Sequence, residues 1–279
     1  MINGKLSLVL PAYNEEPNIE FVVRQALEVL PTVFSDYEVI PVDDGGHDRT
    51  GEIIDELAAE DPHVRPQHHP QNKGYGAALT TGFRAATGDY LMFMDSDRQF
   101  DIHDITRLAP YVGSYDIVAG YRIKRNDPFY RYLIGTGFNQ MVKILFGVDL
   151  RDIDCGFKIF KADLLQSMDL ISPGGLINTE IHAKANVEGR TIVEVGVNHY
   201  ARLEGEQSGA SAKVMLRAVR ETFKLWNRMR SYVPPSGEVV VPPASARGMI
   251  TFVGLVGLGG LVGLATLGLL LGRLFRRQD

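Results

Sequence analysis

The sequence is poor in cysteine and has no excess of positive charge. Its 279 residues include a single cysteine, Cys155, which excludes an internal disulfide and a zinc site built from several thiolates. The formal net charge of −5 argues against bulk nucleic-acid binding, which usually needs a positive surplus. Hydrophobic residues make up 45% of the chain and charged residues 23%, so a disordered or collagen-like protein is excluded. The length predicts one or two folded domains.

Two nucleotide-binding motifs and a secretion signal are also missing. The chain contains neither the GxxxxGK[ST] spacing of a P-loop nor the GxGxxG pattern, and the second absence argues against a dinucleotide-dependent dehydrogenase. The first apolar run is short and meets Pro11, with Glu15 and Glu16 close behind, which is unlike a signal peptide. We therefore expect the large N-terminal part to stay in the cytoplasm.

One long hydrophobic run stands out against these averages. Residues 249–272 form a stretch of 24 without a charge. As a helix it would be roughly 36 Å long, enough to cross a hydrocarbon core of about 30 Å. We predict a single transmembrane helix at 249–272, joined to the rest by a proline-rich linker at 233–248 and followed by a basic tail at 273–279. A buried hairpin or a glycine-rich re-entrant segment is the alternative.

The charges around this run conflict with the expected orientation. Arginines 273, 276 and 277 follow it and only Arg247 closely precedes it, so positive-inside counting places the tail in the cytoplasm. A cytoplasmic N-terminal part anchored by one span would put the tail outside, and we give the missing export signal more weight. Gly259/Gly263 and Gly268/Gly272 have the spacing of associating helices, which suggests a homo-oligomer, although seven glycines produce this spacing by chance nearly as readily.

The N-terminal two thirds alternate between strand-like and helix-like patterns. This alternation predicts an α/β fold, a mostly parallel sheet with helices on both faces, whose ligands bind at the carboxyl ends of the strands. The expected strands are 5–10, 37–42, 90–94 and 116–120. The expected helices between them are 19–30, 51–60, 76–86 and 102–111.

Residues 212–232 form a further predicted helix with a basic stripe. Its cations recur at steps of three or four, at Lys213, Arg217, Arg220, Lys224 and Arg228. Such a helix, close to a membrane anchor, is expected to lie on an anionic membrane surface. The alternative is a helix packed on the domain with a solvated basic face.

Acidic residues follow the expected strand at 90–94 in a pattern that suits a cation. Asp95 and Asp97 are two positions apart, and Gln99 lies two residues further on. Carboxylates at this spacing can hold a divalent ion and leave positions for phosphate oxygens. Oxygen ligands favour magnesium or manganese over zinc. An acidic turn without a ligand is the alternative.

Three other polar segments follow expected strands or open expected helices. Residues 43–46 combine two aspartates with two glycines, which permit a tight turn and close approach of a ligand. Residues 11–16 place an aromatic ring and carboxylates beyond the first strand, where they could hold a nucleobase. Residues 72–78 are rich in glycine and open a helix, so they could sit near a diphosphate. Each segment alone is equally compatible with an ordinary turn or helix start.

Taken in order, these four segments resemble the family 2 glycosyltransferases of GT-A fold. Residues 120–122, 152–158, 179–180 and 202–208 agree with the polyprenyl-phosphate branch, which is similar to dolichyl-phosphate mannosyl- and glucosyltransferases. The resemblance covers residues 5 to about 225 and implies a catalytic domain at 1–211. It leaves the linker and anchor uncovered.

The resemblance also implies roles for individual residues. The residues that match nucleotide-sugar-binding positions are Pro11, Tyr13, Glu15, Asp43, Asp44, Lys73, Ser96 and Ser208. Those that match catalytic positions are Asp97, Arg122, Arg131 and Arg202, with the two arginines at 122 and 131 meeting donor and acceptor phosphates. Those that match metal ligands for Mg²⁺ or Mn²⁺ are Asp95, Asp97 and Gln99.

The implied reaction is an inverting transfer of a sugar from a nucleotide-diphosphate sugar, of the UDP-glucose or GDP-mannose type, to a polyprenyl phosphate at the cytoplasmic membrane face. The acceptor phosphate is already charged near neutral pH, so no obligatory general base is expected, and Glu180 is the alternative. Another acceptor, a polysaccharide or a glycolipid, is a second possibility, although the only tryptophan, Trp226, lacks the QxxRW motif of processive synthases. A non-catalytic membrane scaffold that binds sugar nucleotides is the third.

Overall fold

A computed structural model describes residues 1–123, 129–202 and 212–240, without the side chains of 129–135 and 212–217. Its centre is a seven-stranded sheet with the strand order β3-β2-β1-β4-β6-β5-β7. The strands are β1 (Ile2–Ala12), β2 (Phe34–Asp43), β3 (Gln67–His68), β4 (Tyr90–Met94), β5 (Ile117–Arg122), β6 (Phe157–Lys161) and β7 (Ile192–Val197).

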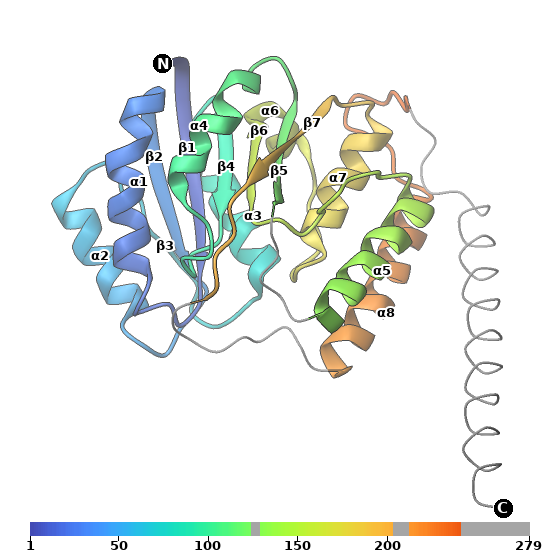
Figure 1. Cartoon of the computed structure of the whole chain (residues 1–279), viewed down its shortest axis with the longest axis horizontal. Coiled ribbons are helices and arrows are strands. Elements are labelled where there is room, and N and C mark those ends of the chain that lie inside the picture. The colour runs from blue at the N-terminus through green and yellow to red at the C-terminus, as the bar shows by residue number, and fades with distance from the viewer. Residues whose placement is uncertain (124–128, 203–211, 241–279) are drawn as a thin grey trace, which may run out of the picture.

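Helices cover both faces of this sheet (Figure 1). The α-helices are α1 (Ile19–Val33), α2 (Thr50–Glu60), α3 (Tyr75–Ala85), α4 (Ile105–Leu108), α5 (Phe129–Phe146), α6 (Ala162–Ser167), α7 (Ile177–Val187) and α8 (Ala212–Met229). Two short 3-10 helices, η1 (Ile102–Asp104) and η2 (Ala109–Tyr111), flank α4. The continuous helix expected at 102–111 is therefore three short pieces: Asp101 caps η1 through its side chain, and Pro110 lies in η2.

The expected α/β architecture is confirmed, with a mixed sheet. β1 pairs in parallel with both β2 and β4, as the alternation predicts. β6, which the sequence analysis does not anticipate, is antiparallel to both β4 and β5. β7 then returns parallel to β5. The insertion of β6 places the loop that precedes it, residues 152–156, next to the carboxyl end of β4.

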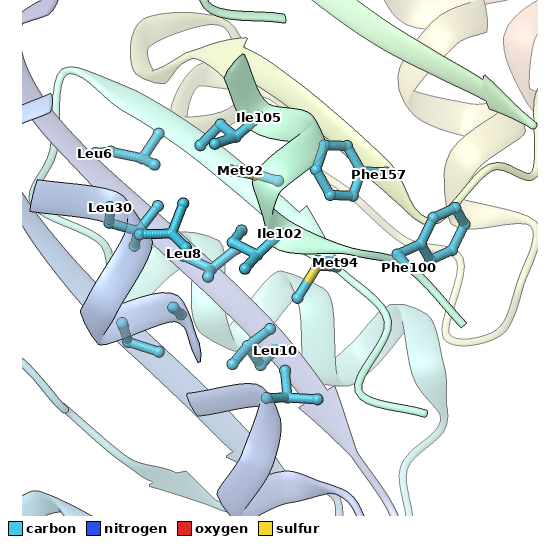
Figure 2. Packing of buried hydrophobic residues seen from close by; sticks show 14 of the residues in the cluster. Leu6, Leu8, Leu10, Leu30, Met92, Met94, Phe100, Ile102, Ile105 and Phe157 are labelled. Atoms are coloured by element: carbon cyan, nitrogen blue, oxygen red, sulfur yellow. The ribbon is translucent and has the colours of Figure 1, made fainter. Parts of the chain in front are cut away.

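Alternate residues of the central strands enter two separate cores, because successive side chains of a strand point to opposite faces. Leu8, Leu10 and Met92 pack under α1 and α4, together with Ile102 and Ile105 (Figure 2). On the other face the core is formed with α3, α6 and α7, by residues that include Val9, Ile40, Phe93, Leu79, Phe83, Leu164 and Ile181. Both faces of the sheet are thus buried, and the strand ends remain as the place for a ligand.

The helix α8 packs on the protein through its apolar side. Leu225, Trp226 and Met229 are buried in a third cluster together with Met141 and Val142 of α5. The two helices lie side by side in Figure 1. The described apolar side chains of α8 therefore contact protein. The expectation that this helix lies on an anionic membrane surface stays a prediction. The cations at 220, 224 and 228 remain exposed, as in the alternative of a packed helix with a solvated basic face.

Several predictions concern parts of the chain outside the described residues. These are residues 203–211 with Ser208, the second half of the linker predicted at 233–248, the membrane span predicted at 249–272 and the tail at 273–279. Within the described part, no helix has the length and apolar character needed to cross a bilayer.

Candidate active site

The carboxyl ends of β1, β2 and β4 lie side by side. Ala12, the last residue of β1, pairs with Asp43, the last residue of β2, and Asp43 in turn pairs with His68 of β3. On the other side of β1, Val9 pairs with Phe93 of β4. The segments that begin at Tyr13, Asp44 and Asp95 therefore leave the sheet at one edge, where sequence analysis expects the ligand.

The turn after β4 carries the predicted metal ligands. The main-chain amide of Asp95 donates to the carbonyl oxygen of Gly156 at 3.1 Å, and Asp97 Oδ1 accepts the amide of Gln99 at 3.1 Å. Both the side chain and the main chain of Gln99 bond to Tyr200. The side-chain Nε2 donates to the main-chain carbonyl oxygen of Tyr200 at 3.0 Å, and the main-chain carbonyl oxygen of Gln99 accepts the Tyr200 amide at 2.9 Å. Arg98 has a left-handed backbone, with φ of 61°. The turn is thus fixed to the segment that follows β7.

The described residues compensate the two carboxylates of this turn only in part. Burial raises the pKa of Asp95 to about 7, and the neighbouring charge of Asp97 adds to the rise. Burial also raises the pKa of Asp97, against the opposing effects of the Gln99 amide and Arg202. Two adjacent acids that resist ionisation in this way form a site that a cation would stabilise.

Arg202 links the β4 turn to the start of the chain. Its Nη2 donates to Glu15 Oε1 at 2.6 Å, and its Nη1 lies 3.6 Å from Asp97 Oδ2. Glu15 also accepts a hydrogen bond from Asn18 Nδ2 at 2.7 Å, and its amide donates to Thr50 Oγ1 at 2.8 Å. Burial raises the pKa of Glu15 even though Asn18 and Arg202 lower it. Three residues that lie far apart in sequence thus meet in one ion network.

The turn after β2 divides its two aspartates between different tasks. Asp43 Oδ1 accepts the amide of Gly46 at 3.0 Å, and Asp43 Oδ2 lies 3.7 Å from His68 Nδ1. Asp44 is buried, and its oxygens accept the amide of Lys73 at 2.9 Å and that of Gly74 at 2.8 Å.

The remaining partner of the Asp44 carboxylate is His69, to which the sequence analysis assigns no role. His69 is buried; its Nδ1 lies 2.6 Å from Asp44 Oδ1, and its Nε2 lies 2.8 Å from Thr81 Oγ1 on α3. Asp44 therefore holds the glycine-rich segment at 72–74 against the end of β2.

The other predicted nucleotide-sugar residues lie at the same edge. Pro11 is buried in β1, whereas the Tyr13 side chain beyond the strand is 41% exposed. Lys73 is exposed. Ser96, between Asp95 and Asp97 in sequence, is buried, and its hydroxyl has no hydrogen-bond partner among the described residues. Arg131 lies in α5, but its side chain is outside the described part of the chain.

Arg122, at the end of β5, is held by an acid that sequence analysis gave no role. Its Nε and Nη2 donate to the two carboxylate oxygens of Asp152, at 2.6 and 2.7 Å. This bidentate pair fixes the plane of the guanidinium group. Arg122 lines a cavity of about 430 Å³ between β5, α5 and the 149–152 segment, with Lys143 and Arg151 among its other cations. The cavity is large enough for a phosphate group and part of its substituent.

Residues 152–156 are anchored from below and support Asp95. Lys158 of β6 is fully buried and donates to the carbonyl oxygens of Ile153 and Cys155. Gly156 packs directly on the carboxylate of Asp95, because a Cβ there would lie 2.0 Å from Asp95 Oδ2. Any other residue at 156 would displace the acid. The sequence shows the glycine but gives no sign of its partner, which lies 61 positions earlier.

Glu180 lies inside the protein on α7. It is 0% exposed and pairs with Lys184, whose Nζ is 2.6 Å from Glu180 Oε1. Its oxygens also accept the amides of Ile171 and Ser172. These contacts do not favour the alternative in which Glu180 acts as a general base, since a base must reach the proton that it removes.

The donor set after β4 fits a magnesium or manganese ion. Asp95 and Asp97 supply carboxylate oxygens, and Gln99 supplies an amide oxygen while its nitrogen faces Tyr200. No cluster of three or more His, Cys, Asp or Glu side chains suited to a metal occurs in the described residues. Two carboxylates with phosphate oxygens and water are a usual environment for Mg²⁺, so this sparse set is consistent with an ion shared with a substrate.

Comparisons with known proteins show which sequences and folds this chain resembles. The sequence model described as glycosyl transferase family 2 matches residues 7–181. Glycosyltransferase AglD of Haloferax volcanii is 35% identical over 204 residues, which are 70% of this chain and 33% of that protein. Undecaprenyl-phosphate 4-deoxy-4-formamido-L-arabinose transferase of Pectobacterium atrosepticum is 30% identical over 213 residues, 75% of this chain and 64% of that protein. The chain thus spans between a third and just under two thirds of these relatives.

Solved structures share the fold. Glucosyl-3-phosphoglycerate synthase from Mycobacterium tuberculosis, in complex with Mn²⁺, UDP and phosphoglyceric acid, has a TM-score of 0.62 at 20% identity. The match covers 80% of this chain and 78% of that one. The same enzyme with Mg²⁺ and UDP gives a TM-score of 0.59. At this identity the likeness establishes the mixed α/β fold of GT-A type.

Proposed function

The chain belongs to glycosyl transferase family 2, as its motifs predict, and on that premise we propose that it transfers a sugar from a nucleotide-diphosphate sugar to a polyprenyl phosphate. The observation that carries the proposal is the convergence of Glu15, Asp97 and Arg202 beside Asp95 at the carboxyl edge of the sheet. Relatives whose names specify undecaprenyl phosphate as acceptor support the choice of acceptor. Neighbours with UDP and Mn²⁺ or Mg²⁺ support the choice of donor and metal.

The donor occupies the edge formed by β1, β2 and β4. Asp43 accepts hydrogen bonds from the nucleoside, and Tyr13, with its exposed ring, lies against the base. Asp44 keeps the 72–74 segment in place beneath the diphosphate. Asp95, Asp97 and Gln99 would hold Mg²⁺ or Mn²⁺, which would supply positive charge to the departing diphosphate.

Arg202 and Arg122 then act on the phosphate groups. Arg202 exchanges part of its contact with Glu15 and Asp97 for a donor phosphate oxygen. Arg122, held by Asp152, directs its remaining N–H groups at the acceptor phosphate in the adjoining cavity. An acceptor oxygen forms the new bond to the anomeric carbon while the bond to the diphosphate breaks, and the electron pair leaves with the nucleoside diphosphate. The attack comes from the opposite face, so the configuration inverts.

The catalytic domain works at the cytoplasmic face of the membrane. The span proposed at 249–272 anchors it, and the exposed cations of α8, Arg220, Lys224 and Arg228, face the anionic lipid surface. This arrangement differs from a helix embedded through its apolar side, because Leu225, Trp226 and Met229 pack on α5.

A donor screen tests the proposal. Detergent-solubilised full-length protein is incubated with polyprenyl phosphate, Mn²⁺ or Mg²⁺, and each of several labelled UDP- and GDP-sugars, and label in the organic phase is counted. We expect metal-dependent labelling of lipid from one donor. The label should be lost in Asp97→Ala and kept in Asp163→Ala, which changes a 70% exposed aspartate on α6.

Two other outcomes would contradict the proposal in different ways. Donor hydrolysis or transfer to a sugar acceptor, without lipid labelling, would establish a glycosyltransferase with another acceptor. Nucleotide-sugar binding with neither hydrolysis nor transfer would instead identify a membrane scaffold.

A further inference from the structure

A buried ion pair on α7 holds a segment that the proposed chemistry does not use. Glu180 and Lys184 lie within the protein, their side chains 0% and 5% exposed. Two buried charges are costly to remove from water unless further hydrogen bonds satisfy them. Here Glu180 accepts the amide of Ser172 at 2.8 Å, and Lys184 donates to the carbonyl of Asp169. The pair therefore fixes residues 169–173, which we call the α7 strap.

The α7 strap lies against the first turn of α3. The carbonyl oxygen of Pro173 accepts the amide of Ala77 at 3.1 Å. A Cβ on Gly76 would lie 2.2 Å from the carbonyl oxygen of Ser172, and one on Gly74 would lie 2.5 Å from that of Pro173. Two glycines thus allow the backbones to approach so closely that the strap determines where α3 begins.

Tyr75 stands between these two glycines and reaches the metal site. Its hydroxyl donates to Asp95 Oδ1 at 2.7 Å. Gly156 packs against the same carboxylate, where a Cβ would lie 2.0 Å from Oδ2. Among the described residues, one hydrogen bond and one close backbone contact therefore locate the Asp95 carboxylate. The hydrogen bond comes from a residue that the α7 strap holds in place.

We propose that Tyr75, held by the Glu180–Lys184 pair through the α7 strap, is a positioning residue that orients Asp95 for the divalent metal. The inference rests on the proposed function, because it takes Asp95 to be a metal ligand. Tyr75 touches neither the metal nor the substrate in this scheme and acts through the carboxylate. Groups that orient metal ligands in this way commonly change metal affinity by about 10- to 100-fold when removed.

The first test is a titration of the full-length protein with Mn²⁺ alone. Binding of Mn²⁺ is monitored through the relaxation rate of water protons. Tyr75→Phe removes the hydroxyl and keeps the ring, so we expect a dissociation constant for Mn²⁺ about tenfold higher with the melting temperature little changed. Tyr111→Phe is the matched control, since Tyr111 is 39% exposed and lies before β5, at the opposite edge of the sheet. It should leave both quantities as they are.

The second test asks whether the α7 strap acts through Tyr75. Gly76→Ala pushes the strap from α3 without altering the tyrosine or the aspartate, and it should also weaken Mn²⁺ binding about tenfold. In the double variant Tyr75→Phe/Gly76→Ala the two losses should not add, because both break the same hydrogen bond. Additive losses would overturn the role of the strap, and Tyr75→Phe alone decides the role of the tyrosine if the glycine variant fails to fold.

The outcomes separate this inference from the proposed function. Equal Mn²⁺ affinities of the unaltered protein and Tyr75→Phe, with sugar transfer intact, would overturn the positioning role alone. A protein that binds no Mn²⁺ and labels no lipid would overturn the proposed function and the inference together.

Discussion

Two acidic turns lie at the same edge of the sheet, one on each side of β1, and their carboxylates have different hydrogen-bond partners. Asp44, after β2, is buried and accepts hydrogen bonds from two amides and from His69. Asp95 and Asp97, after β4, face each other's charge with fewer donors, and the pKa of each is raised. A carboxylate such as Asp44, whose oxygens accept hydrogen bonds from the chain itself, stabilises the conformation of a loop. A pair left under-compensated is suited to an external cation.

The contrast also explains how one edge can be both rigid and reactive. Asp44 ties the 72–74 segment to β2 and so stabilises the floor of the site. The repulsion between like charges occurs in the turn after β4, between Asp95 and Asp97. Two hydrogen bonds between Gln99 and Tyr200 hold this turn in place. We therefore expect substitutions in the turn after β4 to lower activity more than stability. Substitutions at Asp44 should lower stability more than activity.

The largest effect should follow from Asp97→Asn. Losing one charge of the metal site should lower the rate of lipid labelling by about 10²–10³-fold. The free energy of unfolding should stay the same or rise. The charge of Asp97 raises the pKa of its neighbour Asp95, and the substitution removes this repulsion between like charges. Initial rates and melting temperatures measured on the same preparation check both. A variant that keeps its rate within threefold would show that this turn is not the metal site.

Asp44→Asn should produce the opposite result. The asparagine has one acceptor oxygen, so at least one of the amides of Lys73 and Gly74 or the His69 ring loses its partner. A buried donor left unpaired costs about 1–3 kcal/mol, and we expect a loss of roughly 2–3 kcal/mol in the free energy of unfolding by urea. Asp163→Asn, at an exposed site, is the control and should change this free energy by less than about 0.5 kcal/mol. An unchanged urea midpoint for Asp44→Asn would argue against the structural role.

Gly156→Ala tests whether the close packing of the backbone at position 156 sets the position of the Asp95 carboxylate. The added Cβ would lie 2.0 Å from Asp95 Oδ2, so the carboxylate must move. We expect Mn²⁺ affinity to fall about tenfold, with a stability cost of about 1–3 kcal/mol from overpacking. Gly137→Ala on α5, where a Cβ meets nothing within 4 Å, is the matched control. Titration calorimetry or proton relaxation measures the Mn²⁺ affinity of both variants. Equal Mn²⁺ affinities of Gly156→Ala and Gly137→Ala would contradict the close contact between Gly156 and Asp95.

The smallest effect should come from pH. The pKa of Asp95 is raised to about 7, so its carboxyl gains a proton as the pH falls through that value. Protons and metal compete for the same oxygens, and the apparent affinity for Mn²⁺ should fall about fourfold between pH 8 and 6.5. In Asp97→Asn this dependence should move to lower pH, because one of the causes of the raised pKa is gone. A flat profile in the unaltered protein would show that Asp95 is ionised throughout.

Much of the site could be predicted from the sequence because local patterns encode it. The strands at 5–10, 37–42 and 90–94 are present with polar segments at their carboxyl ends, and parallel strands necessarily bring those ends to one edge. The pattern of Asp95, Asp97 and Gln99 likewise lies within a single turn. Spacing along the chain was sufficient for these features, since the interacting residues are near neighbours in sequence.

Contacts between distant segments could not be predicted in the same way. The Tyr75 hydroxyl on Asp95, the Asp152 carboxylate on Arg122 and the Gly156 backbone under Asp95 join residues from different elements. The apolar side of α8 has the same amphipathic pattern whether lipid or protein covers it, and only the packing of Leu225 and Trp226 on α5 distinguishes the two.

The sequence by itself therefore determined the family and the strand ends at which the candidate residues meet, whereas their roles as ligands stay a prediction. These depend on residue identity and on the two-residue period of strands, which are properties of short segments. Only the tertiary structure decided which carboxylates accept several hydrogen bonds from the chain and which have a raised pKa. That distinction depends on the donors that other parts of the chain bring within hydrogen-bonding distance, and burial then sets the cost of each charge that remains.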